Sequence, residues 1–163
     1  MTMKMGLTGE RIEQMATTTA DKSVSVLNEL IAVCEDGANG FAKAAEDALD
    51  VSLKQLFSKY SRQREAYSAE LKEEVASFGG KPEQSGHAMA PLHRGWMTLK
   101  EAFGDKDKAI IDECEAGEDS ALKAYRKALQ EPLPPATLEI VMSQLAGVIE
   151  AHGKLSALKH SRN

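Results

Sequence analysis

Residues 106–130 read KDKAIIDECEAGEDSALKAYRKALQ, and this stretch decides the fold that the rest of the chain must complete. Its apolar residues recur every three or four positions, which is the spacing that keeps one face of a helix against partner helices. The seam consists of Ile111, Cys114, Ala121, Tyr125 and Ala128. At its centre the pattern places a carboxylate, Glu118, where an ordinary core has an apolar residue. The sequence therefore predicts a long helix with a charged, buried midpoint.

Three further stretches carry apolar residues at the same alternating spacing of three and four. They cover about residues 22–48, 51–78 and 135–159. Pro135 suits the first turn of the last one, where a missing N–H costs nothing. The seam that we predict for this last helix consists of Leu138, Val141, Leu145, Val148, His152 and Leu155. No strand signal and no internal repeat is visible, so the fold class is all-α.

A long connection separates the second of these helices from the third. Residues 81–91 read as a loop, and residues 92–103 predict a shorter helix that ends at Gly104. Such a connection can run the length of a bundle, so the second and third long helices should be parallel and joined by a crossover. We therefore expect a ferritin-like four-helix bundle over residues 21–163, preceded by a poorly ordered arm at residues 1–20.

Length and composition limit the function. The 163 residues suit one domain with a sizeable core, and the net charge of -5 argues against nucleic acid as a partner. No apolar run approaches the roughly 20 residues of a membrane span. The first 15 residues lack the apolar core of a secretory signal, so a cytoplasmic location is expected.

Ferritin-like di-iron proteins take one Glu from each of two helices and Glu-x-x-His from each of the other two. Around the midpoint of the second helix, Glu65 is followed three residues later by Ser68, and Arg64 repels cations. On the fourth helix, His152 has Ile149 three residues before it. Two carboxylates without imidazoles make a poor iron site. We therefore expect no cofactor, with iron or manganese as the alternative.

The favoured interpretation is a structural polar layer made of Asp36, Arg64 and Glu118. A buried ion pair adds little net stability, but removing one partner costs about 3–5 kcal/mol. Such a pair would set the register of the helices. The alternative is a divergent metal site, whose candidate ligands are Glu35, Asp36, Glu118, His87 and His93.

Two further interpretations concern small ligands. The crossover holds His93, Arg94 and Trp96, a group that can contact an anion or another ligand, although local capping and pairing around the Trp is the simpler interpretation. Small residues on the first and third helices leave room for a ligand between helices: Gly37, Gly40 and Gly117.

The chain has two cysteines, Cys34 and Cys114, and both fall on apolar seams. Neither belongs to a CxxC motif, so a redox or zinc site is not indicated. If Asp36 and Glu118 are level, the two thiols lie roughly 9 Å apart along the bundle axis, from a rise of roughly 1.5 Å per residue. That separation is too large for a disulfide, so two free, buried thiols are expected.

Three segments carry a family resemblance: DGANGF at 36–41, SGHAMAPLHRGW at 85–96 and CEAGEDSALKAY at 114–125. They resemble a family of uncharacterised bacterial ferritin-like four-helix-bundle proteins, a domain of unknown function, over about residues 24–158. The resemblance implies a ferritin-like bundle with no established activity, and its relatives suggest a role in stress physiology. Ligands of ferritins and rubrerythrins carry over only to Glu118 and to one of Glu35 and Asp36.

These observations favour a non-enzymatic bundle that acts by self-association, as a homodimer, or by docking a partner. The alternative is a divergent carboxylate-bridged metal-binding protein or oxidoreductase.

Overall fold

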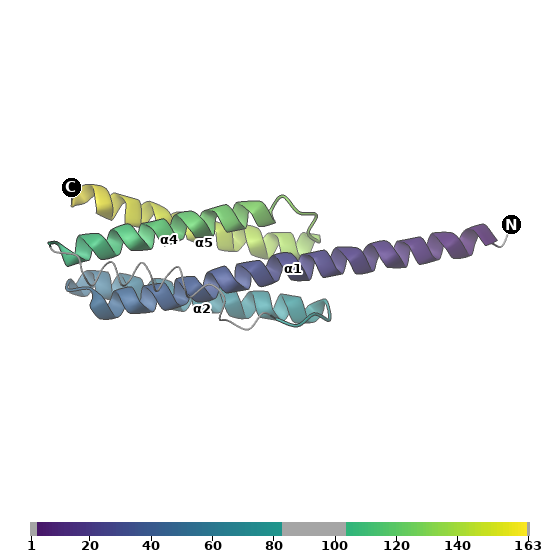
Figure 1. The fold of residues 1–163 in the computed structure, drawn as a ribbon, viewed down its shortest axis with the longest axis horizontal. Helices are drawn as coiled ribbons and strands as arrows, with labels where there is room; N and C mark the ends of the chain where they lie inside the picture. The colour runs from purple at the N-terminus through teal and green to yellow at the C-terminus, as the bar shows by residue number, and fades with distance from the viewer. Residues whose placement is uncertain (1–2, 83–103, 163) are drawn as a thin grey trace.

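The computed structural model describes residues 3–82 and 104–162, with side chains from Gly9 onward. This part of the chain contains four helices and no strand: α1 (Met3–Asp47), α2 (Val51–Ser77), α4 (Lys106–Ala128) and α5 (Pro135–Ser161). In Figure 1, α1 and α2 form one antiparallel pair, α4 and α5 form another, and α2 and α4 run in the same direction. The predicted ferritin-like bundle is confirmed. The short helix predicted at residues 92–103 lies outside the described residues.

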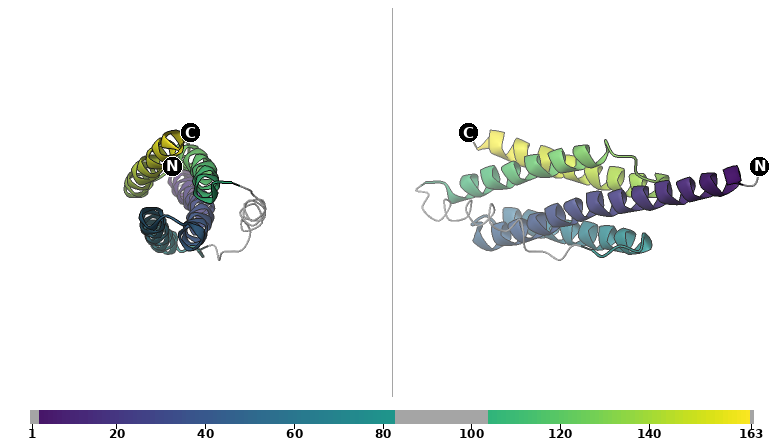
Figure 2. Two further views of the ribbon diagram at one scale, coloured as in Figure 1. Left: turned by 90° about the vertical axis from the view of Figure 1, so that its left-hand side faces the viewer. Right: turned by 45° about the vertical axis from the view of Figure 1, so that its right-hand side comes forward.

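The first helix is longer than the sequence predicts. It begins at Met3 and not near Lys22, and its first turns project past the ends of the other helices (Figures 1 and 2). Residues 9–19 are exposed, so this part of α1 lacks the apolar seam by which we located the helix. The hydroxyls of Thr17, Thr18 and Thr19 each donate to the carbonyl four residues back, which is compatible with a continuing helix.

Aspartates organise the helix starts at the end of the bundle far from the N-terminus. Asp50 caps α2 by accepting from two backbone N–H groups of its first turn, and Asp105 caps α4 in the same way through Lys108. Asp107, buried in the first turn of α4, accepts from the N–H groups of Leu49 and Asp50 at 2.7 and 3.0 Å. This carboxylate therefore ties the link between α1 and α2 to the start of α4.

The buried face of α5 differs from the predicted seam. Val141, Val148 and Leu155 are fully buried as expected, but Leu138 and Leu145 are only half-buried. The helix is rotated so that the polar Thr137 and Gln144 enter the core, together with Ala151. Periodicity could not choose between the two faces, because α5 is apolar on more than one side. The hydrogen-bond partners of the two polar side chains decide the rotation.

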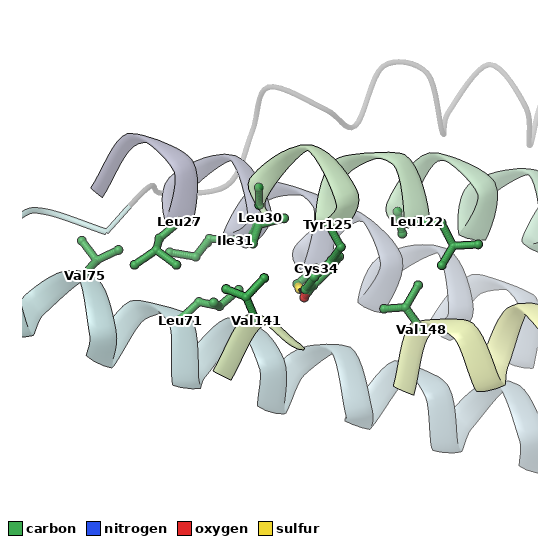
Figure 3. Packing of buried hydrophobic residues seen from close by; sticks show 12 residues of the cluster. Leu27, Leu30, Ile31, Cys34, Leu71, Val75, Leu122, Tyr125, Val141 and Val148 are labelled. Atoms are coloured by element: carbon green, nitrogen blue, oxygen red, sulfur yellow. Dashed lines mark hydrogen bonds between the residues drawn. The ribbon is translucent and has the colours of Figure 1, made fainter. Parts of the chain in front are cut away.

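The core consists of two apolar clusters. One gathers Leu27, Leu71, Tyr125 and Val148 in the half of the bundle that faces the projecting end of α1 (Figure 3). The other gathers Phe41, Phe57, Ile110, Ile111 and Leu155. Along α2 and α4, the buried charged residues between the two clusters are Arg64 and Glu118, so a charged layer separates the apolar halves. Within the described helices, no segment is long and apolar enough to cross a membrane.

Candidate functional site

A buried ion pair lies at the centre of the bundle. Arg64 on α2 donates from Nη1 to Oε1 of Glu118 at 2.9 Å and from Nη2 to Oε2 at 2.6 Å. The two side chains are 1% and 3% exposed. Among the described helices, α2 and α4 are not in direct backbone contact, so this bidentate pair spans the interior diagonal of the bundle. It fixes the axial register of α2 against α4, because the helices align only where the charges meet.

The residues around Arg64 match the size and charge of its side chain. A Cβ at Gly37 would lie 3.3 Å from Cγ of Arg64, so the glycine leaves room for the arginine stem against α1. The guanidinium carbon lies 5.7 Å from the ring centroid of Phe41 and 5.9 Å from that of Tyr67. The two rings add cation–π attraction to the buried guanidinium. Nε of Arg64 has no hydrogen-bond partner in the described part of the chain.

The pKa of the Glu118 carboxyl depends on the charge of Arg64. Burial raises the pKa of the Glu118 carboxyl, and the charge and hydrogen bonds of Arg64 oppose that rise. The pair is therefore the arrangement that lets both buried groups remain charged.

The third residue of the predicted polar layer, Asp36, does not join the pair. It is half-buried on α1, and no hydrogen bond links it to Arg64 or Glu118. Burial raises the pKa of its carboxyl, and the charge of Glu35 adds to the rise. Asp36, Arg64 and Glu118 all line one cavity of about 370 Å³ between α1 and α4. The three glycines that we expected to leave space for a ligand line the same cavity: Gly37, Gly40 and Gly117.

Among the described residues, the remaining candidate metal ligand is Glu35, and it is engaged away from Glu118. Glu35 accepts from the hydroxyl of Ser68 at 3.3 Å and pairs with Lys72. Across residues 9–82 and 104–162, no three His, Cys, Asp or Glu side chains form a group that could hold a metal ion. The predictions that rest on His87, His93, Arg94 and Trp96 lie outside the described residues and stay predictions.

The ferritin-like fold family implies a pair of metal ions at the bundle centre. The residues at that level do not fit such a centre. A permanently charged guanidinium stands where a cation would bind, and both oxygens of Glu118 are engaged by it. We therefore derive no metal chemistry at this position.

A second polar connection, which sequence reasoning missed, crosses the bundle through Gln144. The Tyr125 hydroxyl donates to Oε1 of Gln144 at 2.7 Å, and Nε2 of Gln144 donates to Oε2 of Glu70 at 2.9 Å. Sγ of Cys34 lies 3.0 Å from the Tyr125 oxygen, and Figure 3 shows the two side chains meeting. Since the single hydroxyl proton is used on Gln144, the thiol donates to Tyr125. The sequence contained one signal of this network: Gln144 lies three residues after Val141 and four before Val148, which places it on the same face of the helix.

The two cysteines are free and buried, as predicted. Burial raises the pKa of the Cys34 thiol to about 11 and raises that of Cys114 as well. Both sulfurs are therefore protonated at neutral pH and poor nucleophiles. His152 is not in the core but lies between α4 and α5, where Nε2 is 2.7 Å from Oδ1 of Asp119.

The arrangement of the four helices defines the class of protein, a ferritin-like helical bundle, and solved structures agree. A Dps1 mutant from Mycobacterium smegmatis is similar with a TM-score of 0.70 and 12% identity, over 87% of this chain and 97% of that one. The conserved hypothetical protein Rv2844 from Mycobacterium tuberculosis is similar with a TM-score of 0.70 and 10% identity, over 88% and 93%. These likenesses show the fold alone.

A third structure is a two-domain protein from Anabaena variabilis with DJ-1/ThiJ/PfpI-like and ferritin-like domains. It is similar with a TM-score of 0.70 and 15% identity, over 88% of this chain but only 37% of that one. The family itself is shown by sequence: residues 22–131 match the domain of unknown function DUF2383, and the chain belongs to that family. No curated protein matches the chain.

Proposed function

We propose that this protein is a non-enzymatic ferritin-like bundle that acts by binding protein surfaces, and first of all a second copy of itself as a homodimer. The observation that carries the proposal is the ion pair of Arg64 and Glu118, buried at the level where ferritin-like enzymes hold their metals. A group that is needed to neutralise its partner inside the bundle is not free to take part in redox chemistry.

The polar network around Gln144 supports the same conclusion. Its groups are satisfied by one another, and the Cys34 thiol is protonated, so this network offers no free nucleophile. Large apolar side chains are exposed instead on the outside of the bundle, where they can contact a partner: Ile12, Met15, Leu49, Val51, Met142 and Ile149.

An iron-oxidation assay tests the non-enzymatic part. Purified protein is mixed with ferrous iron in air, and the absorbance of ferric products is followed against a protein-free control. We expect the two traces to coincide for the natural chain. Oxidation that is faster with protein, and that is abolished in Glu118→Gln, would contradict the proposal.

Light scattering coupled to size-exclusion chromatography tests the self-association. We expect a mass twice that of the 17.7 kDa chain, decreasing on dilution. A mass of one chain at every concentration would contradict the homodimer.

The cavity between α1 and α4 favours one second candidate, the binding of a small and largely apolar molecule. Its walls include Val33, Phe41 and Ala121, and the unpartnered Nε of Arg64 can donate to an acceptor on such a ligand. A Cβ at Gly117 meets no atom within 4 Å, so Gly117→Val should reduce the space without a clash. A ligand found by thermal shift should lose its effect in this variant, and an undiminished shift would place it elsewhere.

A further inference from the structure

The outer side of α5 is apolar where a surface helix is ordinarily polar. We use the name outer stripe for Met142, Ala146, Ile149 and Gly153, which are all exposed. The side chains of Met142 and Ile149 are 55% and 49% exposed, and Leu138 and Leu145 lie half-buried beside them. Because α5 also fills the core with Val141, Val148 and Leu155, its outer stripe is a second apolar face with no partner helix in the described bundle.

The outer stripe has the geometry of a helix-pairing seam. Its members are spaced four, three and four residues apart, which is the interval that keeps a seam against one partner helix over several turns. Ala146 and Gly153 are small, so another helix can approach closely between the larger Met142 and Ile149. A partner of complementary shape is therefore another helix with large and small residues in alternation, and α5 of a second copy has this pattern.

Charges beside the outer stripe select the direction of the second helix. Glu139, Glu150 and Lys154 are exposed, and helical spacing places all three along the same edge of the stripe. A twofold axis perpendicular to two antiparallel helices brings the same edge of both copies together. In a parallel pair this edge would face the opposite edge of the second copy, where the half-buried Leu138 and Leu145 lie, so its charges would have no partner. In an antiparallel pair centred beside Ala146, Glu139 lies level with Lys154 of the second copy, and Glu150 lies level with the exposed Ser143.

We propose that two copies of this chain pair through the outer stripe, with their α5 helices antiparallel and Glu139 of each copy paired with Lys154 of the other. The inference rests on the proposed self-association and specifies its surface. The twofold axis passes beside Ala146. The far end of α5 and the projecting part of α1 lie outside the contact.

A charge on the outer stripe should separate the copies. Met142→Glu places two carboxylates in the contact, one from each copy, and should raise the dimer dissociation constant by about 100-fold or more. Ile12 is 62% exposed on the projecting part of α1, so Ile12→Glu is the matched control with the same added charge and no expected change. A dimer that Met142→Glu leaves intact, or that Ile12→Glu separates, would overturn the assigned surface.

Cross-linking tests the antiparallel direction without relying on a loss of binding. Ala146→Cys should form a disulfide-linked dimer under mild oxidation, because the two copies of this position meet near the axis. In Gly153→Cys the two copies are about 20 Å apart along the antiparallel helices, so no cross-link is expected. The natural cysteines, Cys34 and Cys114, are 0% and 9% exposed and should not form cross-links in the folded protein. Cross-linking of Gly153→Cys would establish a parallel pair, because all stripe positions are then level with their counterparts, and this result or the absence of a cross-link in Ala146→Cys would overturn the proposal.

Charge reversal tests the proposed ion pair. Glu139→Lys and Lys154→Glu should each weaken the dimer about tenfold, and the double variant should return to within about threefold of the natural chain. Two weakened single variants without recovery in the double variant would overturn the pairing of these two residues. If the natural chain is a monomer at all concentrations, the proposed self-association fails as well. If it is a dimer that ignores every substitution on α5, only this inference fails.

Discussion

Removing one partner of the central ion pair should lower the free energy of unfolding more than removing both partners. Arg64→Met takes away both hydrogen bonds that Glu118 receives from it and leaves a carboxylate that is 2% exposed, so we expect a loss of about 3–5 kcal/mol. Glu118→Leu strands a guanidinium that keeps its contacts with Phe41 and Tyr67, which reduces the loss to about 2–4 kcal/mol. The double variant should lie within about 1 kcal/mol of the natural chain, because no buried charge remains.

The pH dependence of the two single variants should differ. Without Arg64, burial alone acts on Glu118 and raises its pKa further above the ordinary value of 4.5. The folded state then binds a proton that the unfolded state releases, so stability is lost as the pH rises from 4.5 through the raised pKa. The defect of Arg64→Met should therefore shrink at about pH 5. The defect of Glu118→Leu should stay the same between these two pH values, because the buried carboxyl has been removed.

The assay is urea unfolding followed by far-ultraviolet circular dichroism at about pH 7 and about pH 5, with the slopes compared among variants. Lys127→Met, which breaks an exposed ion pair with Glu29, is the control and should change stability by less than about 1 kcal/mol. We expect a coupling energy between Arg64 and Glu118 of at least about 4 kcal/mol. Single losses below about 1 kcal/mol that add in the double variant would refute the reasoning.

Three further predictions concern the core. Gly147→Ala places a Cβ over the Tyr67 hydroxyl and should cost about 1–2 kcal/mol in urea unfolding, whereas Gly153→Ala meets no atom within 4 Å and should gain up to about 1 kcal/mol; equal effects would contradict the contact. Gln144→Leu leaves the buried Tyr125 hydroxyl without its acceptor and should lower the free energy of unfolding by about 1–3 kcal/mol. The measurement is the midpoint of thermal unfolding, which should fall, and an unchanged midpoint would show that the network is not needed. The pKa of Cys34 is about 11 in the folded state against 9.0 in the unfolded state, so its thiol contributes about 3 kcal/mol to the free energy of unfolding below pH 9, and this contribution is lost towards pH 11. The stability of Cys34→Ala should therefore decline less at alkaline pH than that of the natural chain, and identical curves of stability against pH would refute this prediction.

The ion pair could be anticipated from the sequence because each charge stood alone in an otherwise apolar seam. Arg64 and Glu118 sit where the spacing of three and four demands burial, and two isolated opposite charges can only be buried together. Asp36 was expected to share the layer, but it stands beside the seam position Gly37, and on a helix one residue is a turn of about 100°. Asp36 therefore lines the same cavity as the pair but makes no hydrogen bond to it.

Other features depended on contacts that no local pattern contains. The rotation of α5 is decided by partners of Gln144 on two other helices, so periodicity within α5 could not reveal it. The start of α1 was missed because its first turns are exposed and have no apolar seam. The network of Cys34, Tyr125 and Gln144 joins α1, α4 and α5, and it is visible only once the helices are placed side by side.

An anomalous-difference map from crystals grown with Mn²⁺ tests the central claim most directly, because it locates any ion that competes with Arg64 for Glu118. We predict that Arg64 and Glu118 stay bonded to each other and that the map has no peak between α2 and α4 at their level. A peak within coordination distance of the Glu118 carboxylate, with the guanidinium displaced from it, would contradict the account.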